Sequence, residues 1–305
     1  MTETMRERFV ETTSELLDGE PRLAVVLADI GLAAFADASR RHPGRVANVG
    51  IREQLLVSFA GGLGLSGLRP IVHTYAPFLV ERPFEQVKLD LGHQELGAVL
   101  VSVGASYDGS RMGRTHQTPE DVALIGTLPG WTIAVPGHPD EAEVLLRDAA
   151  ARDDRVYIRL SILQNAQPRP IVPGRLHIER RGSSATVVAV GPMLDPVLEA
   201  ASDLDLTVLY ATTVRPLDGD VLLATLSEPD IVLVEPYQEG TSAAELTRAL
   251  AKVRHRLLSI GVPNVELRRY GDPDDHARAY GLDAEGIRER IVDWLAAAPL
   301  ASRRE

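Results

Sequence analysis

VANVGIREQLLVSFAGGLGL, residues 46–65, is the stretch that decides the fold, because a short apolar strand passes directly into a helix of small residues. We predict the strand over 46–50 and the helix over 55–65, with residues 51–54 opening the helix. Gly61, Gly62 and Gly64 would weaken an ordinary helix. They are explained if another backbone approaches closely, so the stretch predicts a buried helix contact, as in a dimer.

The alternation of strand and helix continues on both sides of this stretch. Before it, residues 4–18 are predicted to be helical, and residues 22–29 form a nearly continuous apolar run that ends in Asp29. Such a run is typical of a buried parallel strand with a polar residue at its carboxyl end. Further strands are predicted over 69–75, 98–103, 131–135 and 156–160, and further helices over 32–42, 84–91 and 140–151. This alternation predicts a doubly wound, mostly parallel α/β sheet.

A break in the pattern divides the chain. Residues 161–183 contain Pro168, Pro170, Pro173 and Gly174, which are typical of a connecting segment. A second cycle begins at residue 185, with strands predicted over 185–191, 206–210 and 230–235 and a helix over 284–295. A length of 305 residues fits two domains. We expect a first domain over 1–165, a linker over 166–183 and a smaller α/β domain over 184–305.

The composition excludes several classes of function. The formal net charge is −11 and the pI about 5.3, and an acidic chain without a basic stripe is a poor nucleic-acid binder. The absence of cysteine excludes disulfides and thiolate-bound metals. The first residues are polar, unlike a signal peptide, and no apolar run reaches the roughly 18–20 residues that a membrane helix needs. We expect a cytoplasmic protein that binds neither nucleic acid nor membrane.

Four side chains combine useful chemistry with a place beside a predicted strand end. Glu53 opens a helix, where the helix dipole favours a carboxylate. The small residues nearby allow close packing, and burial raises the pKa of a carboxyl group, which suits it to exchange a proton with a ligand nitrogen. Tyr75 and Phe78 are placed to flank a flat ring. His116, in the glycine-rich loop 104–117, can donate or accept protons near neutral pH. Each also fits a structural role: a first-turn acid, core aromatics or a hydrogen-bonded loop histidine.

The chain resembles a known family through an ordered set of motifs. These are a strand ending in Asp29, NVGIREQ at 48–54, an aromatic pair, and THQ at 115–117 followed by Glu120 and Asp121. Over roughly residues 4–165 this order resembles the pyrimidine-binding domain of transketolases and of 1-deoxyxylulose-5-phosphate synthase. Residues 183–297 resemble the C-terminal domain of the same family, with VEPY at 234–237 and GTS at 240–242.

The resemblance implies a role for each candidate residue. Glu53 matches the glutamate that hydrogen-bonds the aminopyrimidine ring of thiamine diphosphate and activates the cofactor. Phe78 matches the aromatic residue stacked on that ring, and Tyr75 matches another ring of the pocket. Asp29 matches an acid near the thiazolium, and His116 matches a histidine that handles substrate hydroxyl protons. The implied reaction transfers a two-carbon ketol unit from a ketose to an aldehyde.

Two departures from the family pattern concern the substrate. Gly104 and Met112 occupy the positions of a substrate histidine and an aspartate. The family also has Ser-Arg-Gln-Asn after the next strand, whose arginine holds a sugar phosphate. Here residues 161–165 read SILQN, and Arg159 is the nearest arginine. We therefore hypothesise that at least one substrate is not an ordinary sugar phosphate but an unphosphorylated or otherwise modified sugar or aldehyde. The alternative is that Arg111 or Arg114 binds substrate and replaces the missing charge.

The resemblance also implies a partner. Full-length members carry a Gly-Asp-Gly motif and a downstream Asn that hold Mg²⁺ and the diphosphate, and this sequence has no such pair. We expect an N-terminal transketolase subunit to supply that site, in a heterotetramer with two copies of each chain. Other assignments stay open: the beta subunit of a 2-oxoacid dehydrogenase decarboxylase, a pyruvate-using synthase, or a non-catalytic scaffold that only binds a partner.

Overall fold

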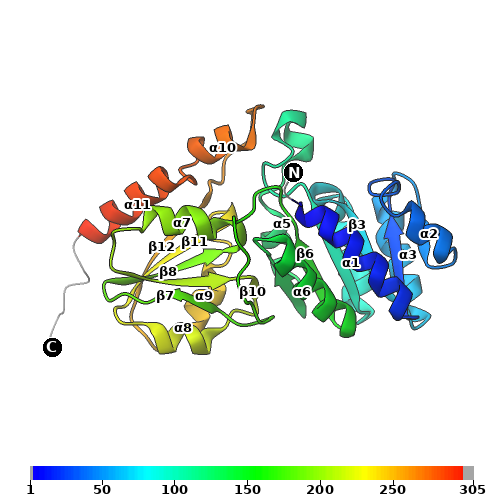
Figure 1. Ribbon diagram of the computed structural model, residues 1–305, viewed down its shortest axis with the longest axis horizontal. Helices are drawn as coiled ribbons and strands as arrows, with labels where there is room; N and C mark the ends of the chain where they lie inside the picture. Colours follow the sequence, from blue (N-terminus) through cyan, green and yellow to red (C-terminus); the bar gives the residue numbers. More distant parts are fainter. Residues whose placement is uncertain (1–2, 298–305) are drawn as a thin grey trace.

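The computed structural model of this protein describes residues 3–297, which form two neighbouring sheets with helices on both faces of each (Figure 1). The strands of the first sheet run in the spatial order β10 (Thr213–Arg215), β5 (Trp131–Ala134), β6 (Arg155–Arg159), β4 (Ala98–Val103), β3 (Arg69–Tyr75), β1 (Leu23–Leu27) and β2 (Val46–Asn48). The strands of the second sheet run in the order β12 (Arg256–Val262), β11 (Asp230–Gln238), β8 (Ala185–Val190), β9 (Leu206–Ala211) and β7 (His177–Arg180).

Both sheets are mostly parallel. Among the described strands, the antiparallel pairs are β10 with β5 and β7 with β9. The predicted α/β fold with two doubly wound units is therefore confirmed. β7 lies inside the segment predicted to be a linker and is part of the second sheet, while the domain boundaries at 165 and 184 remain a prediction.

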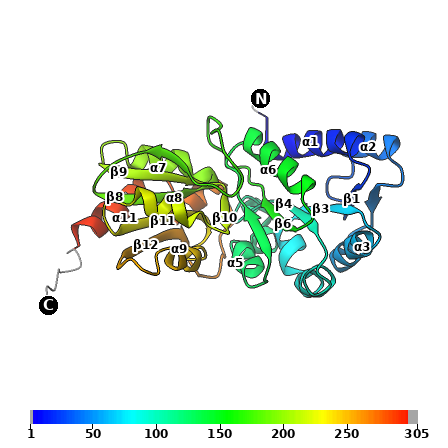
Figure 2. The same ribbon diagram turned by 90° about the horizontal axis from the view of Figure 1, so that it is seen from below.

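Alternate residues of the first sheet pack into cores on its two faces. Val25 of β1 packs in the same cluster as Phe9 of α1 (Met5–Gly19), and Val26 packs in the same cluster as Leu56 of α3 (Glu53–Leu65). Successive side chains point to opposite faces of a strand, which is why these strands read as continuous apolar runs. Figure 2 shows α1 and α6 (Pro139–Ala151) on one side of the sheet and α3 and α5 (Asp121–Gly126) on the other.

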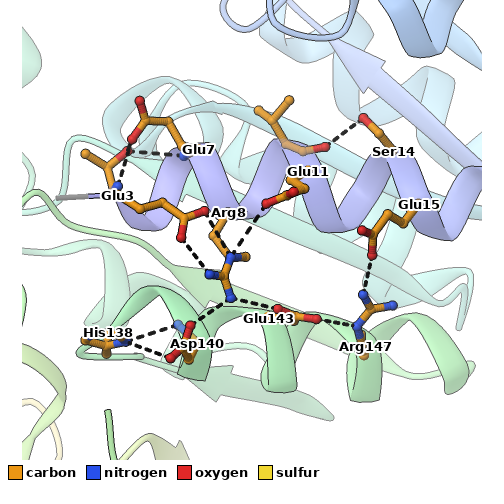
Figure 3. A network of polar contacts seen from close by, with 12 residues as sticks. Glu3, Glu7, Arg8, Glu11, Ser14, Glu15, His138, Asp140, Glu143 and Arg147 are labelled. Carbon is orange, nitrogen blue, oxygen red and sulfur yellow. Dashed lines mark hydrogen bonds and ion pairs between the residues drawn. The ribbon is translucent and has the colours of Figure 1, made fainter. Parts of the chain in front are cut away.

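An ion-pair network fixes α1 on α6 (Figure 3). One guanidinium nitrogen of Arg8, Nη1, lies 2.7 Å from Asp140 Oδ1 and 2.8 Å from Glu143 Oε2. One turn further along α6, Arg147 Nη2 lies 2.5 Å from Glu15 Oε2. A network of several charges with good geometry holds two helices better than an isolated surface pair does. The amino-terminal half of α1 therefore has a defined position above the strand ends.

The structure corrects two predicted helices. The helix expected over 32–42 is shorter, because residues 30–35 form turns before α2 (Ala36–Arg41). The helix expected over 84–91 is longer and irregular: a π-helical turn (Pro77–Glu81), α4 (Phe84–Gln86) and a second π-helical segment (Val87–His93) follow one another. π-Helical turns inside helices are frequent at functional sites.

Helices cover both faces of the second sheet (Figure 1). The helices α7 (Leu194–Ala200) and α11 (Ala284–Ala296) lie on one face, and α8 (Gly219–Thr225) and α9 (Ala243–Ala249) lie on the other. The short helix α10 (Pro273–Ala279) approaches the loop 104–117 of the first unit, where Ser110 Oγ donates to the carbonyl of Gly271 at 2.7 Å. The second unit therefore contacts the loop that carries His116.

Candidate active site

The main cavity lies at the carboxyl ends of the parallel strands β1, β3, β4 and β6. Its volume is about 940 Å³, and its walls are the first half of α1, residues 29–34, Tyr75, the end of β4, part of the loop 104–117 and residues 160–162. Ligands of open α/β sheets bind at this edge, because loops after neighbouring parallel strands meet there. Of the site residues predicted from the sequence, Asp29 and Tyr75 line this space, whereas Glu53, Phe78 and His116 do not.

Glu53 is buried at the first position of α3, with a side chain only 3% exposed. Its Oε1 lies 2.7 Å from Arg82 Nη1. The start of a helix stabilises negative charge. The Glu53 carboxylate is therefore held at the start of α3 by both the helix end and the Arg82 guanidinium.

An aromatic cluster continues from this ion pair. The guanidinium of Arg82 lies 4.0 Å from the ring centroid of Phe78. The Phe78 ring lies 5.1 Å from that of His116 and 5.9 Å from that of Tyr75, with edge-to-face geometry in both pairs. The structure therefore brings together Glu53, Phe78, Tyr75 and His116. Arg82, in the turn before α4, links Glu53 to Phe78, and it was not predicted because an arginine in a turn carries no signal of its own.

Asp29 lines the same cavity as Tyr75 and is held by Asn48. The backbone N–H of Asp29 donates to Asn48 Oδ1 at 2.9 Å, and Asn48 Nδ2 donates to Asp29 Oδ1 at 2.8 Å. Asp29 has a φ of 60°, a left-handed conformation that is uncommon outside glycine and concentrated at functional sites. The cross-strand pair from β1 to β2 explains how this conformation is maintained.

Asp108 is a half-buried acid of the cavity wall that was not predicted from the sequence. Its Oδ2 accepts from the N–H groups of Ala105 at 3.1 Å and Ile162 at 3.0 Å, and its Oδ1 accepts from Ser161 Oγ at 2.9 Å. Burial raises the pKa of Asp108 to about 6, although these hydrogen bonds act in the opposite direction. Asp108 ties the loop 104–117 to the segment after β6. A loop aspartate is usually solvated, so no sequence signal identified it.

Gly104 is required by close packing. It has a φ of +72°, and a Cβ at this position would lie 2.4 Å from Cδ1 of Tyr75. A side chain therefore cannot be placed there unless the Tyr75 ring moves. This is a physical reason for the glycine where the resembling family has a histidine. Met112, the other departure, lines the cavity and is 48% exposed.

Arg111 and Arg114 do not line the cavity. Arg111 forms an ion pair with Asp272 of the second unit. Arg114 Nη2 lies 2.9 Å from Glu120 Oε1, and its Nε lies 3.4 Å from Glu266 Oε1. Both arginines predicted to bind substrate thus form ion pairs with carboxylates of this chain, and these pairs were not predicted from the sequence.

Arg159 is also committed elsewhere. Its side chain is 1% exposed, and its Nε lies 2.8 Å from Asp121 Oδ2, while its Nη2 donates to Ser106 Oγ at 2.6 Å. Its guanidinium carbon lies 5.3 Å from the ring centroid of Tyr237, in the second unit. Arg159 therefore joins the two units and is absent from the cavity wall.

Within residues 3–297, no group of three or more histidine, aspartate or glutamate side chains is arranged to hold a metal ion. Every helix in the same range is too short or too polar to cross a membrane.

The fold and the site define an α/β protein of two doubly wound units, with a ligand cavity at the carboxyl edge of the first. The chain belongs to the transketolase family. Residues 2–164 match the domain described as "Transketolase, pyrimidine binding domain", and residues 174–287 match "Transketolase, C-terminal domain". Members of this family bind thiamine diphosphate through the pyrimidine-binding domain.

Individual relatives differ in how much of them the chain spans. A 33.6 kDa protein of the fasciation locus of Rhodococcoides fascians is 49% identical, over 94% of this chain and 93% of that protein. The 1-deoxy-D-xylulose-5-phosphate synthase of an Acidovorax species is 29% identical over 97% of this chain, but over only 48% of its own length. The chain thus spans about half the length of this synthase.

Two solved structures share the fold. A chain described as a split gene transketolase, in an inactive beta4 tetramer, superposes with a TM-score of 0.84 and 25% identity, over 97% of this chain and 99% of that one. The transketolase of Campylobacter jejuni superposes with a TM-score of 0.78 and 16% identity, over 95% of this chain and 46% of that one. At this low identity, the second likeness concerns the fold alone.

The residues present fit the pyrimidine half of thiamine diphosphate. A flat, nitrogen-containing ring needs an apolar or aromatic wall and a hydrogen-bond acceptor at its edge. Phe78 and Tyr75 offer the rings, and the buried Glu53 carboxylate offers an acceptor.

Proposed function

We propose that this chain is the pyrimidine-binding subunit of a two-chain, thiamine diphosphate-dependent transketolase that transfers a two-carbon ketol unit from a ketose to an aldehyde. The observation that carries this proposal is the buried Glu53 carboxylate beside the Phe78 ring. It occurs in a chain that matches a split gene transketolase chain over nearly its whole length.

In this proposal each site residue has one task. Bound thiamine diphosphate supplies an electron sink for breaking the carbon–carbon bond next to a carbonyl. Glu53 holds a proton at the ring nitrogen, and Phe78 and Tyr75 flank the ring. Asp29 lies on the thiazolium side of the cavity. His116 exchanges protons with substrate hydroxyl groups, for which an imidazole is suited near neutral pH.

We assign Mg²⁺ and the diphosphate mainly to a partner chain, the N-terminal transketolase subunit. This assignment is supported by the description of the split gene relative, whose beta chains form an inactive tetramer. We propose a heterotetramer with two copies of each chain, because the family builds each site across an interface.

The test is to purify this chain alone and together with its partner chain. We expect ketol transfer only from the complex, and weak cofactor binding by the isolated chain. Calorimetry that detects tight, Mg²⁺-dependent cofactor binding by this chain alone would contradict the two-chain proposal. Sedimentation equilibrium measures the assembly, and a mass of one copy of each chain would contradict the heterotetramer.

A synthase that uses pyruvate is the second candidate, favoured by the identity of 29% to 33% with 1-deoxy-D-xylulose-5-phosphate synthases. The two candidates differ in the donor. A pyruvate donor loses its carboxylate as carbon dioxide, whereas a ketose donor releases an aldehyde. Supplying the complex with one donor at a time, and measuring both products, separates them.

A further inference from the structure

The charged side chains of the main cavity are mostly acidic. One cation, Arg6, lines it together with four carboxylates, those of Glu7, Glu11, Asp29 and Asp108. A phosphate dianion is held by several charge-assisted hydrogen bonds, most often from arginine. Four carboxylates around a single cation repel such a group more than they attract it.

The other nearby arginines lie outside the cavity wall. Arg111 and Arg114 are paired with carboxylates outside the cavity, and Arg159 is buried against Asp121. Releasing any of them to a substrate would leave a carboxylate without its partner, and for the buried Asp121 that loss is costly. Within the described residues of this chain, the cavity therefore lacks the cations of a phosphate site.

The remaining wall offers apolar contact. Leu32 is 41% exposed, Met112 48% and Ile162 57%, and all three line the cavity together with Val10. Large apolar side chains exposed around one concave space mark a ligand-binding surface.

Ion pairs hold the α1 side of this cavity in place. Val10 and Arg6 lie on α1, which the Arg8 and Arg147 ion pairs hold on α6 (Figure 3). A preformed wall lowers the ordering cost of binding.

We infer that the acceptor of the proposed ketol transfer is an unphosphorylated aldehyde with an apolar substituent, which contacts Val10, Leu32, Met112 and Ile162. This inference rests on the proposed function. In the reaction, the bond between C2 and C3 of the ketose donor breaks and the remainder leaves as an aldehyde. A new carbon–carbon bond forms between the two-carbon unit and the acceptor's aldehyde carbon, whose oxygen takes up a proton. There is no net oxidation.

The experiment uses the complex with its partner chain and measures kcat/KM with a fixed ketose donor. The acceptors form two matched pairs: glyceraldehyde with glyceraldehyde 3-phosphate, and acetaldehyde with hexanal. We expect no preference for the phosphorylated acceptor and a preference of about tenfold or more for hexanal over acetaldehyde, since added apolar contact favours binding. A tenfold preference for the phosphorylated aldehyde, or hexanal no better than acetaldehyde, overturns the inference.

A substitution in the apolar wall tests where the apolar substituent of the acceptor binds. Ile162→Ala is expected to reduce the hexanal-to-acetaldehyde ratio of kcat/KM about tenfold, whereas Val292→Ala, an equally apolar exposed position on α11 outside the cavity, should leave the ratio unchanged. Equal ratios in the two variants overturn the assignment of the wall.

A single-turnover measurement keeps this inference separate from the proposed function. It follows release of the first aldehyde from the ketose when no acceptor is present. If the first aldehyde is released and the complex uses only phosphorylated acceptors, the inference is refuted and the proposed function stands. No release from any ketose refutes the function, and the inference with it.

Discussion

Replacing Arg159 with methionine tests whether this arginine is structural. The variant keeps much of the side-chain volume but leaves Asp121, which is fully buried, without its cation. Tyr157 Oη would still donate to Asp121 Oδ2 at 2.6 Å, and Oδ1 has no partner among the described residues. Breaking a buried ion pair by removing one partner costs about 3–5 kcal/mol. At about 2–4 °C per kcal/mol for chains of this size class, we expect Tm to fall by roughly 6–20 °C.

The assay is thermal unfolding followed by circular dichroism, with two matched controls. Arg278→Met removes an exposed pair with Asp275 and should change Tm by about 2 °C or less. The double variant Asp121→Asn/Arg159→Met removes both charges and should recover at least half of the lost Tm. The reasoning is refuted if Arg159→Met loses less than about 3 °C, or if the double variant is no more stable than the single one.

Three further perturbations address the site itself. Glu53→Gln in the assembled enzyme should lower kcat about 10²–10⁴-fold and change the cofactor Kd much less, because it removes proton exchange rather than volume; equal losses in turnover and in calorimetric affinity would contradict this. Gly104→Ala should lower Tm by several degrees, since the new Cβ meets the Tyr75 ring and φ is positive; an unchanged Tm would show that the ring moves freely. Burial raises the pKa of Asp108 to about 6 from its ordinary value near 3.8, so the folded state holds the proton more tightly and this group's contribution to stability falls as pH rises from about 4 to 6. The Tm of Asp108→Asn relative to the unaltered chain should therefore rise across that window and level off above it, and a pH-independent difference would count against the raised pKa.

The fold class could be predicted from the sequence, and so could most of the candidate site residues. The buried strands read as apolar runs because both of their faces are covered. Glu53 was recognisable because a carboxylate favours the first position of a helix. These signals are local: they depend on period, on propensity and on the order of neighbouring elements, all of which can be read within a few residues.

Tertiary contacts determine which charged groups are paired. Arg111 pairs with Asp272, Arg114 pairs with Glu266, and the half-buried Asp108 accepts a hydrogen bond from the segment that follows β6. The partners lie up to some 160 residues apart in the chain, at contacts between the two units or between loops. Ion pairing and burial depend on distance in space and on exclusion of water. Neither produces a periodic pattern of residues that could be recognised in the sequence. Arg111 and Arg114 were therefore predicted from the sequence to bind substrate, whereas in the folded chain they form ion pairs with its own carboxylates.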